Sequence, residues 1–165
     1  MLLTYVLNCF WLIVPVLLLN AVLMKKLPSN YQPEFFSKDI PRWVSAGENI
    51  LRILVIAATL VMPLGIGSPE QRVGLAVYLA GLVLYSLSWI MQVWFPKAAW
   101  SESRWGFMAP SYTPILWLVG IAIIGRECFV PIPYWSWIYL GFSTVFLIFH
   151  NLHTWIVFTH WRAAT

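Results

Sequence analysis

Charged side chains are scarce in this sequence, because Asp, Glu, Lys and Arg together make up only 10% of its 165 residues. A soluble domain carries about a quarter charged residues, and so few charges cannot cover a water-facing surface. Hydrophobic residues make up 61% of the chain, and its mean hydropathy is +0.77. The composition therefore predicts an integral membrane protein and excludes a disordered chain, a coiled coil or a soluble enzyme.

Cysteine is also scarce, with Cys9 and Cys128 far apart and no CxxC pair. This excludes a disulfide framework and a thiolate metal site, and we expect two free thiols. The formal net charge of +4 comes from ten Lys and Arg against six Asp and Glu. In a membrane chain this excess concerns topology, so we expect no nucleic-acid partner.

Long apolar runs bounded by charged or turn-forming residues occupy most of the chain. A hydrocarbon core of about 30 Å requires roughly 20 helical residues. Five such runs predict an all-α bundle of five transmembrane helices, a single membrane domain over residues 1–165 with no soluble catalytic domain. The expected spans are about 3–24, 46–65, 73–95, 108–125 and 134–160.

Lys and Arg residues divide unequally between the two sides of this bundle. The positive-inside rule therefore places the N-terminus outside and the C-terminus in the cytoplasm. The first span lacks preceding basic residues and a cleavage site, so we expect a retained anchor rather than a signal peptide. The simple topology favours the bacterial plasma membrane. The inner side holds Lys25, Lys26, Lys38, Arg42, Lys97, Arg104 and Arg162, against Arg72 and Arg126 outside.

The cytoplasmic loop over residues 25–45 is the only long connection. It is too rich in aromatic residues for a solvated linker, and its prolines exclude a long helix. We expect it to lie on the inner interface or to fold over the helix ends as a lid. Its prolines are Pro28, Pro33 and Pro41, and its aromatic residues are Tyr31, Phe35, Phe36 and Trp43.

Polar side chains inside the spans gather toward the cytoplasmic half. Such groups are costly in hydrocarbon unless they are paired, so their clustering predicts a polar chamber in the inner half of the bundle. All five spans contribute to it. The group comprises Asn20, Glu48, Asn49, Arg52, Tyr85, Ser86, Ser88, Gln92, Ser111, Tyr112, Thr113, His150, Asn151, His153, Thr154 and His160.

The polar residues of the fifth span indicate which face of this helix points into the chamber. Ser136, Ser143 and His150 recur every seven residues and share one helix face. His150 and His153 either bond neighbouring hydroxyl or carbonyl groups, or form a ligand-binding or proton-handling pair. A metal site needs three or more ligands, and Glu48 is the only acidic candidate at this depth, so we expect no metal.

Glu48 and Arg52 lie four residues apart, the spacing of an ion pair along one helix. Ser45 and Glu48 also match a capping box, in which Ser45 would be the N-cap. Arg52 is then either the structural partner of Glu48 or an anion-binding group in the chamber.

Gly74, Gly81 and Ser88 recur at intervals of seven in the third span, and this spacing predicts a face that another helix approaches closely. The chain also holds eleven tryptophans. Those inside spans either pack or contact lipid, or they line a site for a flat hydrophobic ligand. They are Trp11, Trp89, Trp117, Trp137 and Trp155.

The architecture resembles the translocator protein family, the tryptophan-rich sensory proteins, with five spans and one long first loop. Three segments carry the resemblance: residues 41–44 (PRWV), residues 75–82 (LAVYLAGL) followed by Trp89, and residues 129–131 (FVP) followed by Tyr134 and Trp137. The sequence departs from the family in lacking its Trp-x-Pro-Pro loop segment. It also has Tyr85 where an Asn is expected. The resemblance implies binding of tetrapyrroles, sterols or similar lipophiles in a pocket lined by Trp43, Trp89 and Trp137.

We expect a receptor, sensor or carrier for a hydrophobic molecule, in which Arg52 and His150 would bind a carboxylate or hydroxyl. One alternative is an enzyme acting on an inner-leaflet lipid or isoprenoid, with His150, His153 and Glu48 as catalytic candidates. Another is an accessory subunit of a larger membrane complex, and a homo-oligomer is a further candidate. Haem or porphyrin is the candidate cofactor. The predicted ligand-binding residues are Trp43, Glu48, Arg52, Tyr85, Trp89, Tyr112, Trp137, Ser143, His150 and His153.

Overall fold

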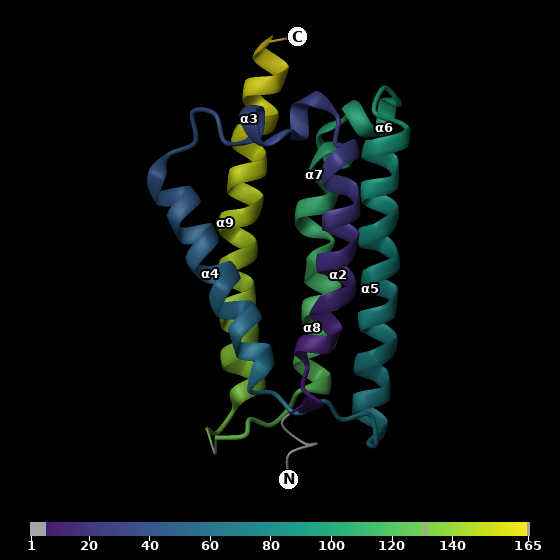
Figure 1. Ribbon diagram of the computed structural model, residues 1–165, viewed down its shortest axis with the longest axis vertical. Helices are drawn as coiled ribbons and strands as arrows, with labels where there is room; N and C mark the ends of the chain where they lie inside the picture. Colours follow the sequence, from purple (N-terminus) through teal and green to yellow (C-terminus); the bar gives the residue numbers. More distant parts are fainter. Residues whose placement is uncertain (1–5, 131, 165) are drawn as a thin grey trace.

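The computed structural model describes residues 6–130 and 132–164, and within these ranges the chain is helical with no strand. The predicted all-α class is therefore confirmed. Figure 1 shows the long helices side by side, with the start of α2 and the end of α9 at opposite ends of the molecule. The long elements are α2 (Phe10–Leu23), α4 (Arg42–Leu60), α5 (Pro69–Trp94), α7 (Arg104–Tyr112), α8 (Pro114–Ile124) and α9 (Trp135–Ala164). Short helical turns are η1 (Met24–Lys26), η2 (Ser29–Tyr31), α3 (Pro33–Phe36) and α6 (Ala99–Glu102).

Four helical stretches among the described residues are long and apolar enough to cross a membrane. They are Arg42–Leu60, Pro69–Trp94, the α7 and α8 pair over Arg104–Ile124, and Trp135–Ala164. These correspond to the second to fifth predicted spans, and they make the chain an integral membrane protein. Helix α2 has 14 residues, a length of roughly 21 Å at 1.5 Å per residue.

The first predicted span, about 3–24, is longer than the helix that forms there. Residues 1–5 lie outside the described ranges, and α2 begins only at Phe10. The backbone before it pairs with the segment after α4: the Cys9 N–H donates to the Met62 carbonyl at 2.8 Å. The Asn8 side chain accepts from the Phe10 N–H at 3.1 Å and marks the helix start. Both cysteines are free thiols, as expected.

Helix α4 begins one turn earlier than the predicted start at residue 46, because Pro41 ends the loop and Arg42 is the first helical residue. Ser45 therefore lies inside the helix, and the predicted Ser45–Glu48 capping box is wrong. A capping box does start α5, where Ser68 and Gln71 bond each other's backbone N–H at 3.2 and 3.1 Å.

Helices α5 and α8 pack backbone to backbone. A Cβ atom built on Gly81 would lie 2.4 Å from the backbone nitrogen of Trp117, and one built on Gly120 would lie 2.5 Å from that of Tyr78. Only glycine allows this approach. The predicted small-residue face over Gly74, Gly81 and Ser88 is thus confirmed for its glycines, and its partner is α8.

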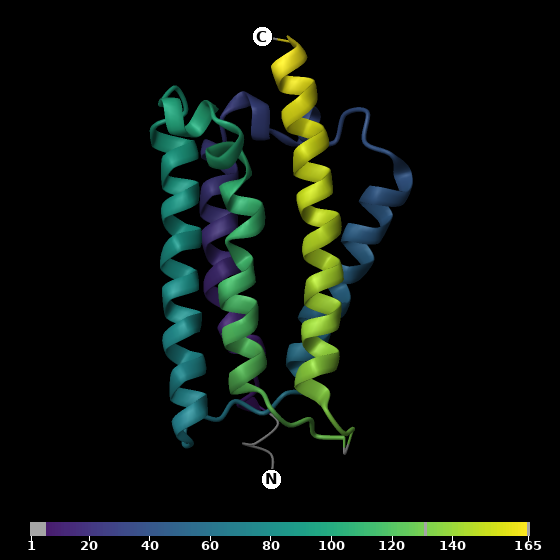
Figure 2. The same ribbon diagram turned by 180° about the vertical axis from the view of Figure 1, so that it is seen from behind.

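The helices form two groups, with α4 against α9 and α5 against α8, which Figures 1 and 2 show from opposite sides. Helix α2 lies beside α5 and reaches α4 across the space between the groups. This arrangement leaves room among α2, α4, α5, α8 and α9, where the candidate site lies.

The first loop folds over the helix ends, which agrees with the second of its two predicted placements. Tyr31 is 5% exposed, and its ring stacks on Phe107 of α7 at 4.8 Å and meets Trp89 of α5 edge-on at 5.4 Å. Its hydroxyl donates to the Phe107 carbonyl. Burial raises the pKa of the Tyr31 phenol well above its usual value. Tyr31 therefore anchors the loop to α5 and α7.

Candidate functional site

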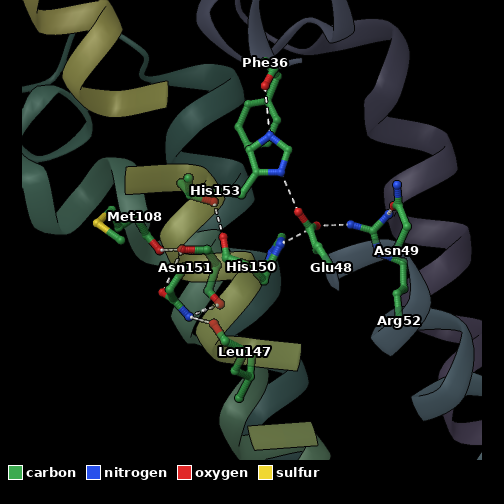
Figure 3. Close-up of polar contacts among 11 residues, drawn as sticks. Phe36, Glu48, Asn49, Arg52, Met108, Leu147, His150, Asn151 and His153 are labelled. Atoms are coloured by element: carbon green, nitrogen blue, oxygen red, sulfur yellow. Dashed lines mark hydrogen bonds and ion pairs between the residues drawn. The ribbon is translucent and has the colours of Figure 1, made fainter. Parts of the chain in front are cut away.

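The carboxylate of Glu48 is the centre of a buried polar cluster between α4 and α9 (Figure 3). Glu48 is 3% exposed. Its Oε1 lies 2.9 Å from Nδ1 of His150 and also accepts from the Arg52 guanidinium, one turn along α4. Its Oε2 lies 2.5 Å from Nδ1 of His153. Both carboxylate oxygens are therefore occupied by nitrogen groups.

His153 has a partner at each ring nitrogen. Its Nε2 lies 2.9 Å from the backbone oxygen of Phe36 in the first loop. A carbonyl oxygen only accepts, so this Nε2 carries a hydrogen. The contact between Nδ1 and Oε2 of Glu48 then requires one shared proton. Whichever atom holds that proton, Glu48 and His153 together have no net charge.

Arg52 consequently supplies a positive charge that no carboxylate in the cluster balances. Its two terminal nitrogens bond Glu48 and the Asn49 side-chain oxygen, the latter at 3.3 Å. A guanidinium has five N–H donors, so three remain after these contacts. The Arg52 side chain is 47% exposed and borders the cavity described below.

His150 is oriented by Glu48 and by stacking. Its ring lies parallel to that of Phe146, with 5.4 Å between centroids and 12° between planes. Since Nδ1 donates to the carboxylate, Nε2 of the neutral ring keeps a lone pair. Within residues 6–130 and 132–164, Nε2 has no hydrogen-bond partner. His150 thus has one ring nitrogen that is available to a ligand.

A cavity of about 490 Å³ lies beside this cluster. Its wall is mostly apolar, with polar residues on α2, α4, α5 and α9 and with the first loop at one end. The predicted polar chamber is therefore an apolar cavity that carries a polar patch. The cavity is lined by Ile13, Val16, Leu17, Asn20, Leu23, Met24, Leu27, Tyr31, Phe36, Arg52, Val55, Ile56, Tyr85, Trp89, Pro114, Trp117, Phe146 and His150.

Asn20 and Tyr85 form the second polar contact of the cavity wall. The Tyr85 hydroxyl donates to Asn20 Oδ1 at 2.7 Å and joins α5 to α2. This bond fixes the amide so that its N–H groups are its remaining donors. Asn20 and Arg52 therefore both offer N–H donors to the same cavity.

The predicted site residues divide into three groups. Arg52, Tyr85, Trp89 and His150 line the cavity. Glu48 and His153 lie behind the wall and hold the lining residues in place. The others lie elsewhere: Trp43 and Trp137 are 62% and 70% exposed, Tyr112 donates to the Trp105 carbonyl at 3.1 Å, and Ser143 is 2% exposed outside the cavity wall.

Helix geometry explains why Trp137 and Trp43 lie away from the cavity. At 100° per residue, Trp137 is about 220° around α9 from His150, and Trp43 is about 140° around α4 from Glu48. Each tryptophan therefore faces away from the polar residue on its own helix. Trp43 instead meets the Phe149 ring edge-on at 6.0 Å.

Most of the lining residues were missing from the predicted ligand-binding set, among them Asn20, Tyr31, Trp117 and Phe146, although Asn20 belonged to the predicted polar chamber. Asn20 shares a face of α2 with Ile13, Val16 and Leu17, a signal that helical spacing could have given. The loop residue Tyr31 had no such signal, because its position depends on how the loop folds back.

Two other polar groups are used in helix packing. Asn151 bonds the Leu147 carbonyl at 2.8 Å and the Ser111 hydroxyl at 3.0 Å, which joins α9 to α7.

In the part of the chain that the structure describes, no three His, Cys, Asp or Glu side chains are arranged to hold a metal ion. The two histidines beside Glu48 direct Nδ1 at its carboxylate instead.

Comparison of the chain with protein-family models, with curated proteins and with solved structures finds no match.

Proposed function

We propose that the protein binds a hydrophobic small molecule in the cavity between its helices, as a sensor, receptor or carrier. The observation that carries this proposal is the combination of a mostly apolar wall with a few polar groups at one place. Ligand sites in proteins have this composition, and their volumes run from about 300 to 1,000 Å³. The tetrapyrroles, sterols and lipid-like molecules implied by the resemblance to translocator proteins are the first probes.

The proposal includes the topology. We infer five spans, with α2 as the first, the N-terminus outside and the C-terminus in the cytoplasm of a bacterial cell. Figure 1 supports this charge distribution, because η1, α6, the start of α4 and the end of α9 lie at one end of the bundle. These segments hold or adjoin the seven inner Lys and Arg residues. Arg126 lies at the other end and pairs with Glu70 at 3.6 Å.

The test is retention of probe molecules by the detergent-purified protein. Protoporphyrin, haem and cholesterol are each incubated with the protein, free probe is removed, and bound probe is quantified by absorption or mass spectrometry. We expect saturable binding of at least one probe, with close to one molecule per chain. Absence of saturable binding by all three, together with no co-purified lipophile, would contradict the proposal.

Two adjacent leucines on α2 supply a matched pair of variants. Leu17 lines the cavity, whereas Leu18 is 61% exposed and does not. Leu17→Trp adds bulk to the cavity and should reduce retention at least tenfold. Leu18→Trp adds the same bulk outside it and should leave retention unchanged. Equal effects of the two variants would place the probe outside the cavity.

A second candidate function is proton transfer on an inner-leaflet lipid or isoprenoid. The observation that favours it is the orientation of His150, whose Nδ1 contacts Glu48 at 2.9 Å while Nε2 has no partner in the described chain. A carboxylate that fixes the tautomer of a histidine is a common arrangement for a general base. His153 is unsuited to this role, because both of its nitrogens are engaged.

The enzymatic candidate predicts turnover that depends on His150. Total membrane lipid is incubated with the wild type, with His150→Gln and with His160→Gln, and its components are compared by mass spectrometry. A component consumed by the wild type and His160→Gln, but not by His150→Gln, supports catalysis. Unchanged lipid in all three samples leaves binding without chemistry as the function.

A further inference from the structure

The charge of the buried cluster indicates the kind of molecule that the cavity takes. Glu48 and His153 together are neutral, because the Phe36 carbonyl fixes a hydrogen on Nε2 and one proton lies between Nδ1 and Oε2. Arg52 therefore gives the cluster a net charge of at least +1. No second carboxylate lies within ion-pair distance of Arg52 in the described ranges.

This unbalanced charge lies on the middle of a membrane-spanning helix. Arg52 is the eleventh of the 19 residues of α4, roughly 15 Å from its first residue. A cationic side chain at such depth is costly and normally faces a partner or a water-filled cavity. The partner that Arg52 has, Glu48, is already neutralised by His153.

The polar patch of the cavity is also rich in donors. Arg52 has three N–H groups beyond those bonded to Glu48 and Asn49, and the Asn20 amide presents its N–H groups from α2. Glu48 is not among the residues that line the cavity, and both histidines contact its carboxylate, so it does not repel an anion there.

We propose that the cavity binds an amphiphile with an anionic headgroup, which Arg52 and Asn20 hold while its apolar body lies among the lining side chains of α2, α4, α8 and α9. This inference rests on the proposed binding function and narrows it to anionic ligands. The headgroup chemistry is a carboxylate or a phosphate, and its source is either a free amphiphile or an anionic membrane lipid.

The test compares two probes that differ only in the headgroup. These are mid-chain dibrominated octadecanoate and the matching dibrominated octadecanol, added to the full chain in phosphatidylcholine nanodiscs at pH about 9, where the carboxyl is ionised. Bromine quenches tryptophan fluorescence on contact, and Trp89 and Trp117 line the cavity. We expect the acid to bind about 10 to 100 times more tightly than the alcohol, the range that hydrogen bonds to a charged group give.

Arginine variants identify the group responsible. In Arg52→Gln the preference for the acid should fall to about twofold or less, and Arg52→Lys should keep part of it because the charge remains. Arg72→Gln is the matched control, since Arg72 lies in the first turn of α5, away from the cavity, and bonds the Gly67 carbonyl. Asn20→Leu should weaken acid binding without changing any charge.

Each outcome decides between the two proposals. Similar binding of acid and alcohol to the wild type, or an acid preference that survives in Arg52→Gln, would overturn the anionic headgroup and leave the binding function standing. Absence of saturable quenching by either probe would overturn both. Addition of phosphatidylglycerol to the nanodiscs distinguishes the source of the anion. Competition with the acid indicates a membrane lipid, and unchanged binding indicates a free amphiphile.

Discussion

His153 on α9 and Glu48 on α4 face each other where these two helices pack, with 2.5 Å between Nδ1 and Oε2. The other nitrogen of the same ring bonds the Phe36 carbonyl at 2.9 Å. One side chain thus joins α9 to α4 and to the first loop (Figure 3). The position of the loop over the cavity and the neutralisation of Glu48 depend on the same residue.

Replacement of His153 tests the connection of α9 to α4 and to the first loop. In His153→Ala, Glu48 keeps Arg52 and His150 but loses one buried partner, and the Phe36 carbonyl loses its donor. Breaking a buried pair costs about 3 kcal/mol at the lower end of measured cases, which corresponds to a fall in Tm of roughly 6 to 12 °C for a chain of this size. Thermal unfolding of the purified protein in detergent measures this fall in Tm.

The matched control is His160→Ala, seven residues along the same helix, where the side chain is exposed. Its Tm should change by no more than about 2 °C, as is usual for a surface substitution. If Tm falls equally in His153→Ala and His160→Ala, His153 does not join the loop to α4 in the way described.

A second prediction concerns the loop itself. Tyr31→Phe keeps the ring but removes the hydroxyl that donates to the Phe107 carbonyl. A buried acceptor without its donor costs about 1 to 3 kcal/mol, so the loop should open more often. Limited digestion with trypsin should then cleave after Lys25, Lys26 and Lys38 several times faster than in the wild type.

Tyr134→Phe serves as the comparison, because Tyr134 is 79% exposed. Its digestion rate should match that of the wild type. Cleavage of Tyr31→Phe at the wild-type rate would show that the Tyr31 hydroxyl does not hold the loop closed.

Tyr31 also makes the stability of the folded protein depend on pH in the alkaline range. Burial raises the pKa of the Tyr31 phenol well above its usual value of 10.0, so the folded protein favours the neutral form. The stabilisation from this group is fully present below pH about 10 and is lost as the pH rises through the raised value. A phenolate also cannot donate to the Phe107 carbonyl.

Ultraviolet titration of tyrosinate formation measures this effect. The wild-type curve minus the Tyr31→Phe curve isolates Tyr31, and its midpoint should lie clearly above 10. A midpoint at or below 10 would contradict the burial of Tyr31 in the folded loop.

Most of the helical architecture could be predicted from the sequence, because long apolar runs allow little else in a membrane. The boundaries were less accurate. Helix α4 starts at Arg42 rather than at residue 46, directly after Pro41, because a proline has no backbone N–H and the helix does not extend back through it. The start of α2 at Phe10 depends on backbone pairing between Cys9 and Met62, which are distant in sequence.

The candidate site could be predicted only in part. Polar residues inside apolar spans identified Glu48, Arg52, His150 and His153, because each requires a polar partner at the same depth in the membrane. Which partner each one found depends on how α4 packs against α9, and no local pattern encodes that packing. Tryptophan had no such constraint, because it suits a lipid-facing position and a cavity wall equally well.

The close approach of α5 and α8 gives a final prediction, which uses three glycines in helices. In Gly81→Ala the new methyl group would lie 2.4 Å from the backbone nitrogen of Trp117, and in Gly120→Ala it would lie 2.5 Å from that of Tyr78. Backbone atoms cannot move aside as a flexible side chain can, so the helices must separate. We expect each variant to lose about 1 to 3 kcal/mol of unfolding free energy.

Gly141 of α9 should behave in the opposite way. A Cβ atom there meets no atom of residues 6–130 and 132–164 within 4 Å, so Gly141→Ala gains helix propensity without a clash. The gain is up to about 1 kcal/mol. Unfolding by dodecyl sulfate in mixed micelles measures all three variants under one condition. Because the chemical change is identical, a difference in sign between Gly141 and the other two isolates the backbone contact of α5 with α8. Three changes of the same sign would show that this contact does not determine stability.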